Sequence, residues 1–412
     1  AVTIGSSTSV DFTVAEGNDH VLELDTGGGV INRQAVLTGN GNTFSTQSTS
    51  ASAASPDSTS QDRDGFSVDE LIASTVQDAV DAADSGANID IKDGTYKERV
   101  VIDRASDNSG LTLTSAAGSS KPVIEKNDDN GKPTIAVDHD SITLDDLEVK
   151  RDSGSNVAQA VRIAGNNITL DSNNCKIEGS DNAAIAVLTD SSGAAGNPSF
   201  TGTIDSVTIK GGTITASTDG TADGEVGVAI ANSGNASFSD DSADQPVVTI
   251  GSNSQVTFKT DEGNDYVVEQ GTGGGVVDLQ SVLENNAFNS DPNTDASGVS
   301  VSDSDRSEFG LSVDGLVAST IQDAVGDAAK DADVKIKDGT YNEEVTIGKN
   351  ITLTKATGTP TISGQVRITR AVGGSNTLKV SDLDINHDSS NAGGNKKSTI
   401  LFDQTKTKEN IT

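Results

Sequence analysis

Oxygen-bearing side chains at alternate positions are the clearest candidate for chemistry in this chain. Asp291, Asn293 and Asp295 follow one another at intervals of two residues, as the first oxygen ligands of a calcium-binding loop do. The twelfth position of such a loop supplies a bidentate glutamate, whereas this chain has Ser302 there. The pattern indicates a Ca²⁺ site at these three residues, with a solvated loop as the alternative. No other cofactor is required.

Two further candidates for catalysis have a simpler structural explanation. Asp145 and Asp146 form a carboxylate pair of the kind that hydrolyses glycosidic bonds, but a chain with 62 acidic residues contains such pairs by chance. We interpret them as a corner between strands, where consecutive side chains point in opposite directions. Cys175 is the only cysteine, and with no histidine near it in the sequence we interpret it as a small apolar strand residue. The sequence therefore predicts no catalytic residue.

Asn-X-Ser/Thr sequons are candidates for modification. They begin at Asn167, Asn235, Asn350 and Asn410, and three of them read Asn-Ile-Thr at the start of an expected strand. In exported proteins such sequons mark surface positions that accept a glycan. We expect glycosylation of at least one of the four.

The elements that position these residues follow from a stretch that occurs twice, at 75–102 and again at 320–347. In the first copy Val76, Ala79 and Val80 have the i, i+3, i+4 spacing that gives a short helix one buried face. The apolar period then changes to two, which is typical of strands. A short helix therefore leads into a series of short strands.

Specific residues recur in both copies. They are Val76-Gln77, Ala79-Val80-Asp81, Gly94-Thr95-Tyr96, Glu98, Val100 and Ile102 in the first copy, and Ile321-Gln322, Ala324-Val325, Gly339-Thr340-Tyr341, Glu344 and Val345 in the second. This pattern resembles the start of a pectin-lyase-like right-handed β-helix, in which a helix of the type IQ.AVD.A closes the coil and GTY.E.V.I forms its first strands. The resemblance implies an all-β chain of right-handed parallel β-helix modules, each preceded by a small β-module and a capping α-helix. It implies little about function, because this fold carries many activities.

The resemblance invites a search for the family's chemistry. The hydrolase set of Asn-Thr-Asp, Asp-Asp, Gly-His-Gly and Arg-Ile-Lys is absent as a group. A calcium-dependent lyase needs an arginine base, for which Arg162 and Arg367 are candidates, each in a Val-Arg-Ile strand that is expected to expose it. Sugar-binding clefts usually present Trp or Tyr platforms, yet the chain has no Trp and three Tyr. We therefore predict that the protein is not an enzyme, and a polysaccharide lyase or hydrolase, or a carbohydrate-binding protein, is the alternative.

A second repeat sets the domain boundaries. The block that begins at Val2 and contains Glu-Gly-Asn-Asp and Gly-Gly-Gly returns from Val248. Segments rich in Ser, Thr and Asp separate each block from its helix and predict exposed linkers. The expected units are a small β-module (1–44), a linker (45–66), a β-helix with its capping helix (67–245), a second small β-module (246–288), an acidic linker (289–311) and a second, truncated β-helix (312–412).

Composition limits the partners and the setting. The chain has 62 acidic and 28 basic residues and a net charge of -34, which disfavours nucleic acid and anionic membranes. An acidic surface with few large aromatics stays hydrated in concentrated salt, where screening removes most self-repulsion. No apolar stretch is long enough for a membrane span. We expect a halophilic, archaeal source, with an acidic calcium-rich secreted protein of ordinary salinity as the alternative.

Together these features predict a non-enzymatic structural glycoprotein outside the cell, part of a surface layer (S-layer), filament or fibre, with a viral fibre as another alternative. By the repeat, the last residues, 409–412, match 166–169 inside the first coil. Open strand edges at the two ends would then allow an end-to-end homopolymer, or further copies of the module beyond Thr412. Cell-surface glycans are further candidate partners.

Overall fold

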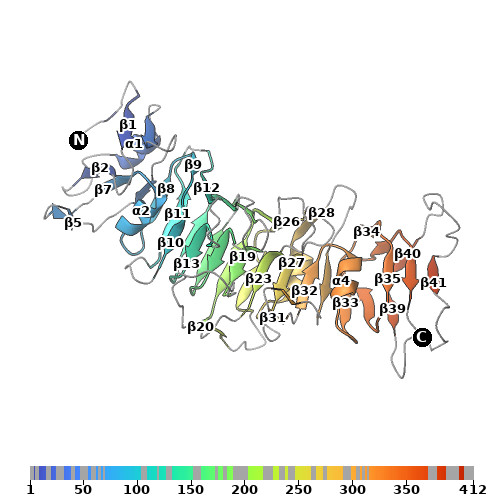
Figure 1. Cartoon of the computed structure of the whole chain (residues 1–412). Coiled ribbons are helices and arrows are strands. Elements are labelled where there is room, and N and C mark those ends of the chain that lie inside the picture. The colour runs from blue at the N-terminus through green and yellow to red at the C-terminus, as the bar shows by residue number, and fades with distance from the viewer. Residues whose placement is uncertain are drawn as a thin grey trace.

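The protein is a long rod of short, stacked strands, with β1 (Asp11–Val14) and β41 (Ile400–Phe402) near its opposite ends, as the computed structural model in Figure 1 shows. The structure describes residues 4, 9–14, 20–24, 32–38, 42–46, 54–56, 62–63, 66–67, 70–103, 109–117, 120–126, 132–151, 159–171, 175–179, 183–188, 203–216, 226–231, 237–239, 246–260, 266–271, 276–290, 298–302, 307–308, 311–312, 315–369, 378–386 and 399–402.

Three long sheets run along the rod. The nine-stranded sheet contains, in spatial order, β2 (His20–Leu24), β7 (Glu70–Ala73), β4 (Ala54–Pro56), β8 (Asn88–Ile91), β11 (Thr112–Ser115), β14 (Thr143–Asp145), β17 (Ile168–Asp171), β21 (Val207–Lys210) and β25 (Val248–Ile250). The seven-stranded sheet contains β9 (Thr95–Tyr96), β12 (Val123–Lys126), β15 (Glu148–Arg151), β18 (Lys176–Glu178), β22 (Thr213–Thr215), β26 (Thr257–Thr260) and β28 (Ala287–Ser290). The eleven-stranded sheet contains β10 (Val100–Ile102), β13 (Ile135–Val137), β16 (Val161–Ile163), β19 (Ala183–Val187), β23 (Val226–Ile230), β27 (Tyr266–Gln270), β32 (Gly315–Ala318), β29 (Val299–Val301), β33 (Asp333–Ile336), β36 (Thr352–Lys355) and β39 (Lys379–Ser381).

Smaller sheets complete the second coil and the ends. The second coil adds β34 (Thr340–Tyr341), β37 (Thr361–Ile362) and β40 (Asp384–Ile385) in one sheet, and β35 (Val345–Ile347), β38 (Val366–Ile368) and β41 in another. The remaining pairs are β1 with β3 (Thr43–Thr46), β5 (Asp62–Arg63) with β6 (Phe66–Ser67), β20 (Thr203–Ile204) with β24 (Ser237–Phe238), and β30 (Ser307–Glu308) with β31 (Leu311–Ser312).

Apolar side chains at alternate strand positions point into the rod and stack from one turn to the next. In the nine-stranded sheet, parallel pairing aligns Ile89, Leu113, Leu144, Leu170 and Ile209, each at most 2 % exposed. Short strands suit this arrangement because each turn of the coil buries one face of every strand. The prediction of an all-β chain with long sheets of parallel strands is confirmed, and this stacking is consistent with a parallel β-helix.

The helices are short, and two of them cap coils. They are α1 (Arg33–Thr38), α2 (Val76–Ala82), α3 (Leu279–Asn285) and α4 (Ile321–Asp327). In α2, Val76, Ala79 and Val80 are fully buried, and the Thr75 hydroxyl accepts a hydrogen bond from the Asp78 N–H at 3.0 Å, as an N-cap does. Among the described residues, none of the helices is long and apolar enough to cross a membrane.

The segment 246–288 differs from its prediction as a separate small β-module. Its strands β25, β26 and β27 pair in parallel with β21, β22 and β23, so it forms the last turn of the first coil. Three short alternating strands have the same sequence pattern whether they stack on a coil or fold alone. The boundary expected at 246 therefore falls between two stacked turns.

The two segments predicted as exposed linkers each contribute a strand instead. In the segment 289–311, β29 pairs antiparallel with both β32 and β33, and Val299 and Val301 are fully buried. In the segment 45–66, β4 pairs with β7 and β8 in the same way, and Ala54 is fully buried. The polar composition concealed these few apolar residues. Because β32 also pairs with β27, the eleven-stranded sheet passes from the first coil into the second.

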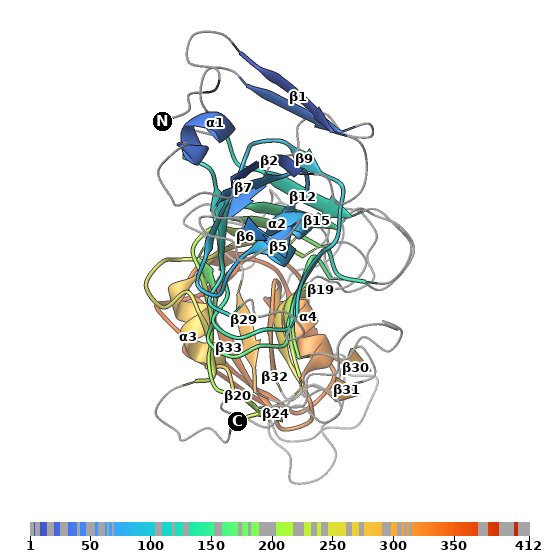
Figure 2. The same cartoon turned by 90° about the vertical axis from the view of Figure 1, so that its left-hand side faces the viewer.

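The described strands and helix of the N-terminal block match those of the last turn of the first coil. Phe12 and Phe44 stack at 5.1 Å between ring centroids, as Phe258 and Phe288 do at 5.8 Å. Each block also contains a helix, α1 or α3, which was not predicted because each buries only two adjacent residues and these show no i, i+3 spacing. Figure 2 shows α1 and β1 at the N-terminal end of the rod.

Candidate functional site

In both capping helices, the first N–H groups donate hydrogen bonds to a glutamate carboxylate from the strands that follow the helix in the chain. The Glu98 carboxylate accepts hydrogen bonds from the N–H groups of Val76 at 2.9 Å and Gln77 at 3.0 Å. Glu343 binds the first N–H groups of α4 in the same way, at 2.9 Å and 2.8 Å. The counterpart of Glu98 in the second copy is therefore Glu343, and the assignment of Glu344 from the sequence was wrong by one residue. These carboxylates accept hydrogen bonds from N–H groups that have no partner within the helix, because the first turn of a helix leaves its N–H groups unpaired.

A glutamine side chain in each capping helix makes hydrogen bonds to a strand backbone, as a neighbouring strand would. The side-chain oxygen of Gln77 accepts from the Val101 N–H at 2.7 Å, and its amide donates to the Val101 carbonyl at 3.1 Å. In the second copy, the Gln322 oxygen accepts from the Thr346 N–H at 2.6 Å. Because β10 and β35 are the first strands of their sheets, these contacts satisfy backbone groups that no strand pairs. This glutamine recurs in the sequence motif, but the motif alone does not predict its contact with the strand.

The caps make stability depend on pH. Burial raises the pKa of Glu98 to about 7, against the lowering effect of its two backbone hydrogen bonds, and burial also raises the pKa of Glu343. A raised pKa in the folded state stabilises the fold below the ordinary glutamate pKa, and this stabilisation is lost as the pH rises through about 7. We expect Glu98→Gln to weaken the fall in unfolding free energy between about pH 5 and pH 8, by at most about 1.4 kcal/mol per pH unit.

The measurement is chemical denaturation at constant high salt across that pH range. Glu344→Gln is the matched control, since it removes the same charge from an exposed side chain. If the slopes of Glu98→Gln and Glu344→Gln are alike, the cap carboxylate does not control this pH dependence.

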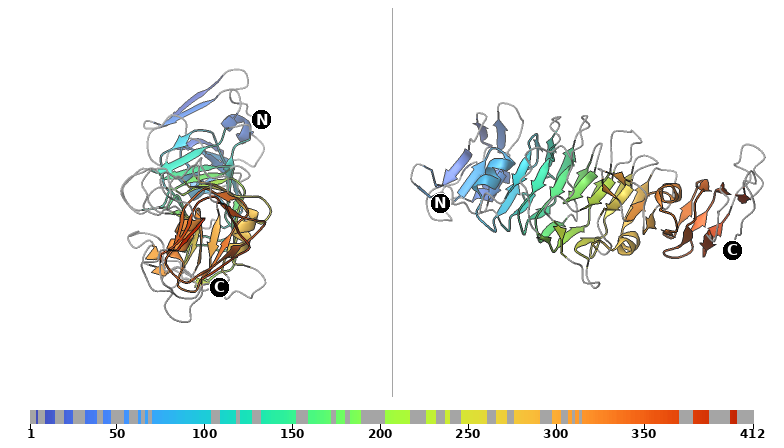
Figure 3. Two further views of the ribbon diagram at one scale, coloured as in Figure 1. Left: turned by 90° about the vertical axis from the view of Figure 1, so that its right-hand side faces the viewer. Right: turned by 60° about the horizontal axis from the view of Figure 1, so that its bottom comes forward.

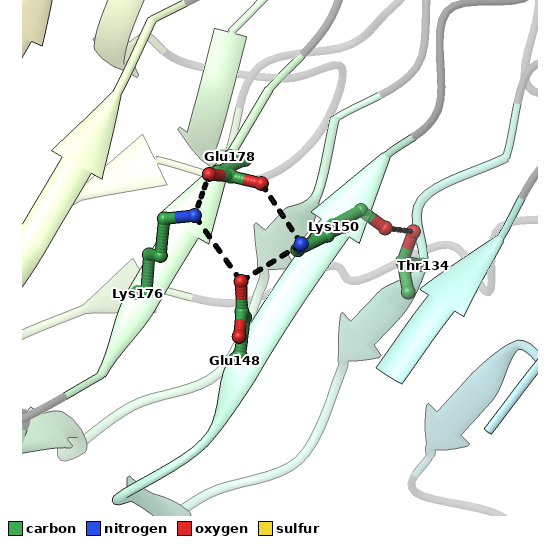
Figure 4. Close-up of polar contacts among 5 residues, drawn as sticks. All are labelled: Thr134, Glu148, Lys150, Lys176 and Glu178. Atoms are coloured by element: carbon green, nitrogen blue, oxygen red, sulfur yellow. Dashed lines mark hydrogen bonds and ion pairs between the residues drawn. The ribbon is translucent and has the colours of Figure 1, made fainter. Parts of the chain in front are cut away.

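The outer face of the seven-stranded sheet carries a ring of four alternating charges (Figure 4). The Lys150 ammonium lies 2.9 Å from Glu148 Oε1 and 3.5 Å from Glu178 Oε2. The Lys176 ammonium lies 3.2 Å from Glu148 Oε1 and also contacts Glu178. The parallel register sets Glu148 opposite Lys176 and Lys150 opposite Glu178. The Thr134 hydroxyl donates to the Lys150 carbonyl at 2.9 Å and so links β15 to the preceding turn of the coil, where Thr134 stands just before β13.

This ring of charges specifies register more than it adds stability. The hydrogen bond with Glu148 is the main cause of the raised pKa of Lys150. Burial opposes ionisation of Glu148, but the hydrogen bonds from Lys150 and Lys176 outweigh it and lower the pKa of Glu148. Exposed pairs of this kind contribute at most about 1 kcal/mol each, whereas a slipped strand would lose every opposite-charge contact. The lysines also neutralise the ring, so it does not attract cations.

Asp145 and Asp146 form the predicted corner. Asp146 follows β14 with φ +51°, a left-handed conformation that turns the chain. Asp145 stands opposite Asp171 of the next turn, which itself pairs with Lys210 at 2.7 Å. Burial, followed by the charges of Asp171 and Asp146, raises the pKa of Asp145. The structure thus places these carboxylates in a surface ladder between stacked turns.

The two candidate arginines and the cysteine have different environments. Arg367 is exposed, as predicted. Arg162 is only 4 % exposed, so the expectation of exposure was wrong: its neighbours in register, Ala136 and Ala186, are buried as well, and this outer face is covered. Cys175 is 3 % exposed, and burial raises the pKa of its thiol to about 12. Such a thiol is a packed apolar residue, as predicted.

The predicted calcium ligands and two of the sequons, Asp291, Asn293, Asp295, Asn235 and Asn410, lie outside the described residues. Within the described part of the chain, no group of three or more His, Cys, Asp or Glu side chains is arranged to hold a metal ion. Asn167 is exposed at a turn with φ +55°, and its amide donates to the Ser141 hydroxyl at 3.1 Å. Asn350 is 5 % exposed, which leaves little room for a glycan on the folded coil. Asn167 is therefore the best-placed described sequon.

The last described turn of the coil, formed by β39, β40 and β41, lies at one end of the rod (Figure 3), and part of its apolar interior is exposed. Val380 in β39 is 36 % exposed and Ile400 in β41 is 41 % exposed, and they are the exposed large hydrophobic residues of the described chain. Their partners one turn earlier, Leu353 and Val366, are at most 1 % exposed. An open coil end offers both apolar side chains and strand edges to another strand.

Comparison with known proteins gave no match: no family model, no curated protein and no solved structure is significantly similar to this chain.

Proposed function

We propose that this protein is a non-enzymatic structural component of a cell surface, such as a surface layer, filament or fibre, and that its work is mechanical. The supporting observation is the eleven-stranded sheet, which runs from β10 in the first coil to β39 in the second. Each strand in it is bonded to its neighbours, so bending the rod or pulling its turns apart strains many hydrogen bonds together. A rigid rod with capped, aligned turns fits a load-bearing role.

The proposed setting is outside a halophilic, archaeal cell. The net charge of -34 is tolerable where salt screens repulsion over a few ångströms. The ring formed by Glu148, Lys150, Lys176 and Glu178 shows how the few lysines serve to align strands. Asn167, exposed at a turn, is the proposed attachment point of a glycan. Ca²⁺ bound by the acidic surface, and by Asp291, Asn293 and Asp295 in particular, would add local screening.

We further propose that copies join end to end. The exposed Val380 and Ile400 lie on the last described strands, and burying them under another turn would remove apolar surface from water. A contact between unlike ends leaves each new end free to bind again, so it builds an open filament unless a ring closes.

The test is a salt series on the purified chain with two measurements, thermal unfolding and particle mass by light scattering. Between about 0.1 M and 1 M salt, the screening length of electrostatic interactions falls from roughly 10 Å to 3 Å. We expect the melting temperature to rise steeply with salt, with calcium partly replacing it at low salt, and multimers to appear at high salt. Melting that is independent of salt would contradict the halophilic setting. A monomer at every salt concentration would contradict end-to-end assembly.

A further inference from the structure

The junction inside the chain shows how a coil of this sequence receives its next turn. At that junction β25, β26 and β27 stack on β21, β22 and β23. Three inward pairs, one in each sheet, carry the contact: Ile209 with Ile250, Ile214 with Phe258, and Val228 with Val268. All six side chains are at most 3 % exposed. The receiving turn and the added turn therefore meet through one apolar pair in each sheet.

The C-terminal turn has the features of a receiving turn. In the second coil, parallel register continues the three equivalent inward columns to Val380 in β39, Ile385 in β40 and Ile400 in β41. Val380 and Ile400 remain 36 % and 41 % exposed, although the residues behind them in the columns are buried. Ile385 is partly buried. These three side chains occupy the positions that Ile209, Ile214 and Val228 hold at the internal junction.

The N-terminal block has the features of an added turn. Its residues Ile4, Phe12 and Leu22 correspond in the repeat to Ile250, Phe258 and Val268. These three side chains are only partly buried, whereas their counterparts at the internal junction are at most 3 % exposed. In addition, β2 is the last strand of the nine-stranded sheet. The N-terminal block thus has the same apolar residues as the added turn at the internal junction, but in the block these residues are less buried.

From this correspondence we infer that the C-terminal turn of one copy receives the N-terminal block of a second copy in the register of the internal junction, with Val380 against Ile4, Ile385 against Phe12, and Ile400 against Leu22. This inference rests on the proposed end-to-end assembly and specifies its interface. All three pairs are apolar, and each extends a column that is already buried in its own copy. The second copy is the occupant because its N-terminal block repeats the turn that covers the first coil.

The same register makes assembly depend on salt. It sets Asp384, which precedes Ile385, opposite Asp11, which precedes Phe12; the internal junction has Thr213 opposite Thr257 at these positions. Like charges directly opposite one another on neighbouring strands are unfavourable, and added salt weakens their repulsion. The multimers should therefore dissociate at a salt concentration at which the single chain is still folded.

The test is cross-linking between two variants that each gain one cysteine, Ile400→Cys and Leu22→Cys, mixed at high salt under mild oxidation. Adjacent strands lie about 4.8 Å apart, within the roughly 4.4–6.8 Å that a disulfide spans between Cα atoms. We expect the mixture to give a covalent dimer and neither variant alone to give one. The native Cys175 is buried in both variants. Leu401→Cys mixed with Leu22→Cys is the matched control, because consecutive strand residues point to opposite faces.

Three results would overturn the inferred interface. Equal cross-linking of the Ile400 and Leu401 variants would show that the register is wrong. Multimers of the wild-type chain without a cross-link in the Ile400 mixture would show that assembly uses other surfaces, while the proposed assembly itself would stand. A wild-type monomer at every salt concentration, as would follow if continuing chain covered the C-terminal turn, would contradict both. As a second check, Ile400→Asp should abolish multimers, and Thr346→Asp, at an exposed position away from the end, should not.

Discussion

Replacing Val80 with aspartate is expected to destabilise the protein by on the order of 4 kcal/mol, the size of effect seen when an unpaired charge is buried. Val80 is fully buried in α2 and belongs to the apolar cluster that includes Ile89 and Val100. A carboxylate there cannot reach water without lifting the helix from the coil. Lifting the helix would also remove the Glu98 and Gln77 contacts and expose the first turn of strands. The measurement is denaturant unfolding at high salt.

Asp78→Ala is the matched control in the same helix. The Asp78 side chain is partly exposed, and it accepts a long, weak hydrogen bond from the Ser74 hydroxyl at 3.4 Å. The Thr75 cap binds the Asp78 backbone, which alanine retains, so the loss should not exceed about 1 kcal/mol. Equal losses in the two variants would show that α2 does not cover the coil through its Val80 face.

The cap was predictable from sequence because its signals are local. Val76, Ala79 and Val80 show the helical period within five residues, and Thr75 stands where an N-cap is needed. The strands of the coil were predictable for the same reason, since alternation such as Ile89-Asp-Ile91 appears within three residues. The parallel stacking followed from the resemblance of these signals to a known family, not from alternation itself.

The positions that sequence reasoning missed depend on contacts distant in the chain. Glu98 meets the start of α2 across 22 residues. The ungapped repeat aligns Glu343 with Glu98, but no local pattern shows that either carboxylate contacts the helix. Arg162 is buried in the folded chain. The sequence Val-Arg-Ile alone favours an exposed arginine, because alternate strand residues point outward. Likewise, β29 pairs with β32 and β33 through Val299, Ser300 and Val301, so only two valines mark this strand within a polar segment. These contacts depend on which turns of the coil lie next to each other, and a short stretch of sequence does not specify that.

Gly165→Ala is expected to be strongly destabilising, because Gly165 lies where two stacked turns touch. A methyl group added there would come within 1.9 Å of the His139 carbonyl oxygen and 2.7 Å of its carbon. These are backbone atoms of the preceding turn, which cannot rotate away as a flexible side chain can. The adjacent Ala164 N–H donates to the Val137 carbonyl at 2.7 Å, so separating the turns breaks the ladder. We expect a loss of about 3 kcal/mol, at the upper end for overpacking.

Gly326→Ala tests the same chemical change where the structure leaves room. Gly326 is exposed in α4, and an added methyl group meets no atom within 4 Å. Alanine in a helix is favoured over glycine by roughly 0.5–1 kcal/mol, so this variant should unfold at a slightly higher denaturant concentration than the wild type. The two glycine-to-alanine changes should thus move stability in opposite directions in one denaturation experiment at fixed salt. If Gly165→Ala also proved neutral or stabilising, the close contact between the turns at His139 would not exist in solution, and the stacking distance of the coil would have to be larger there.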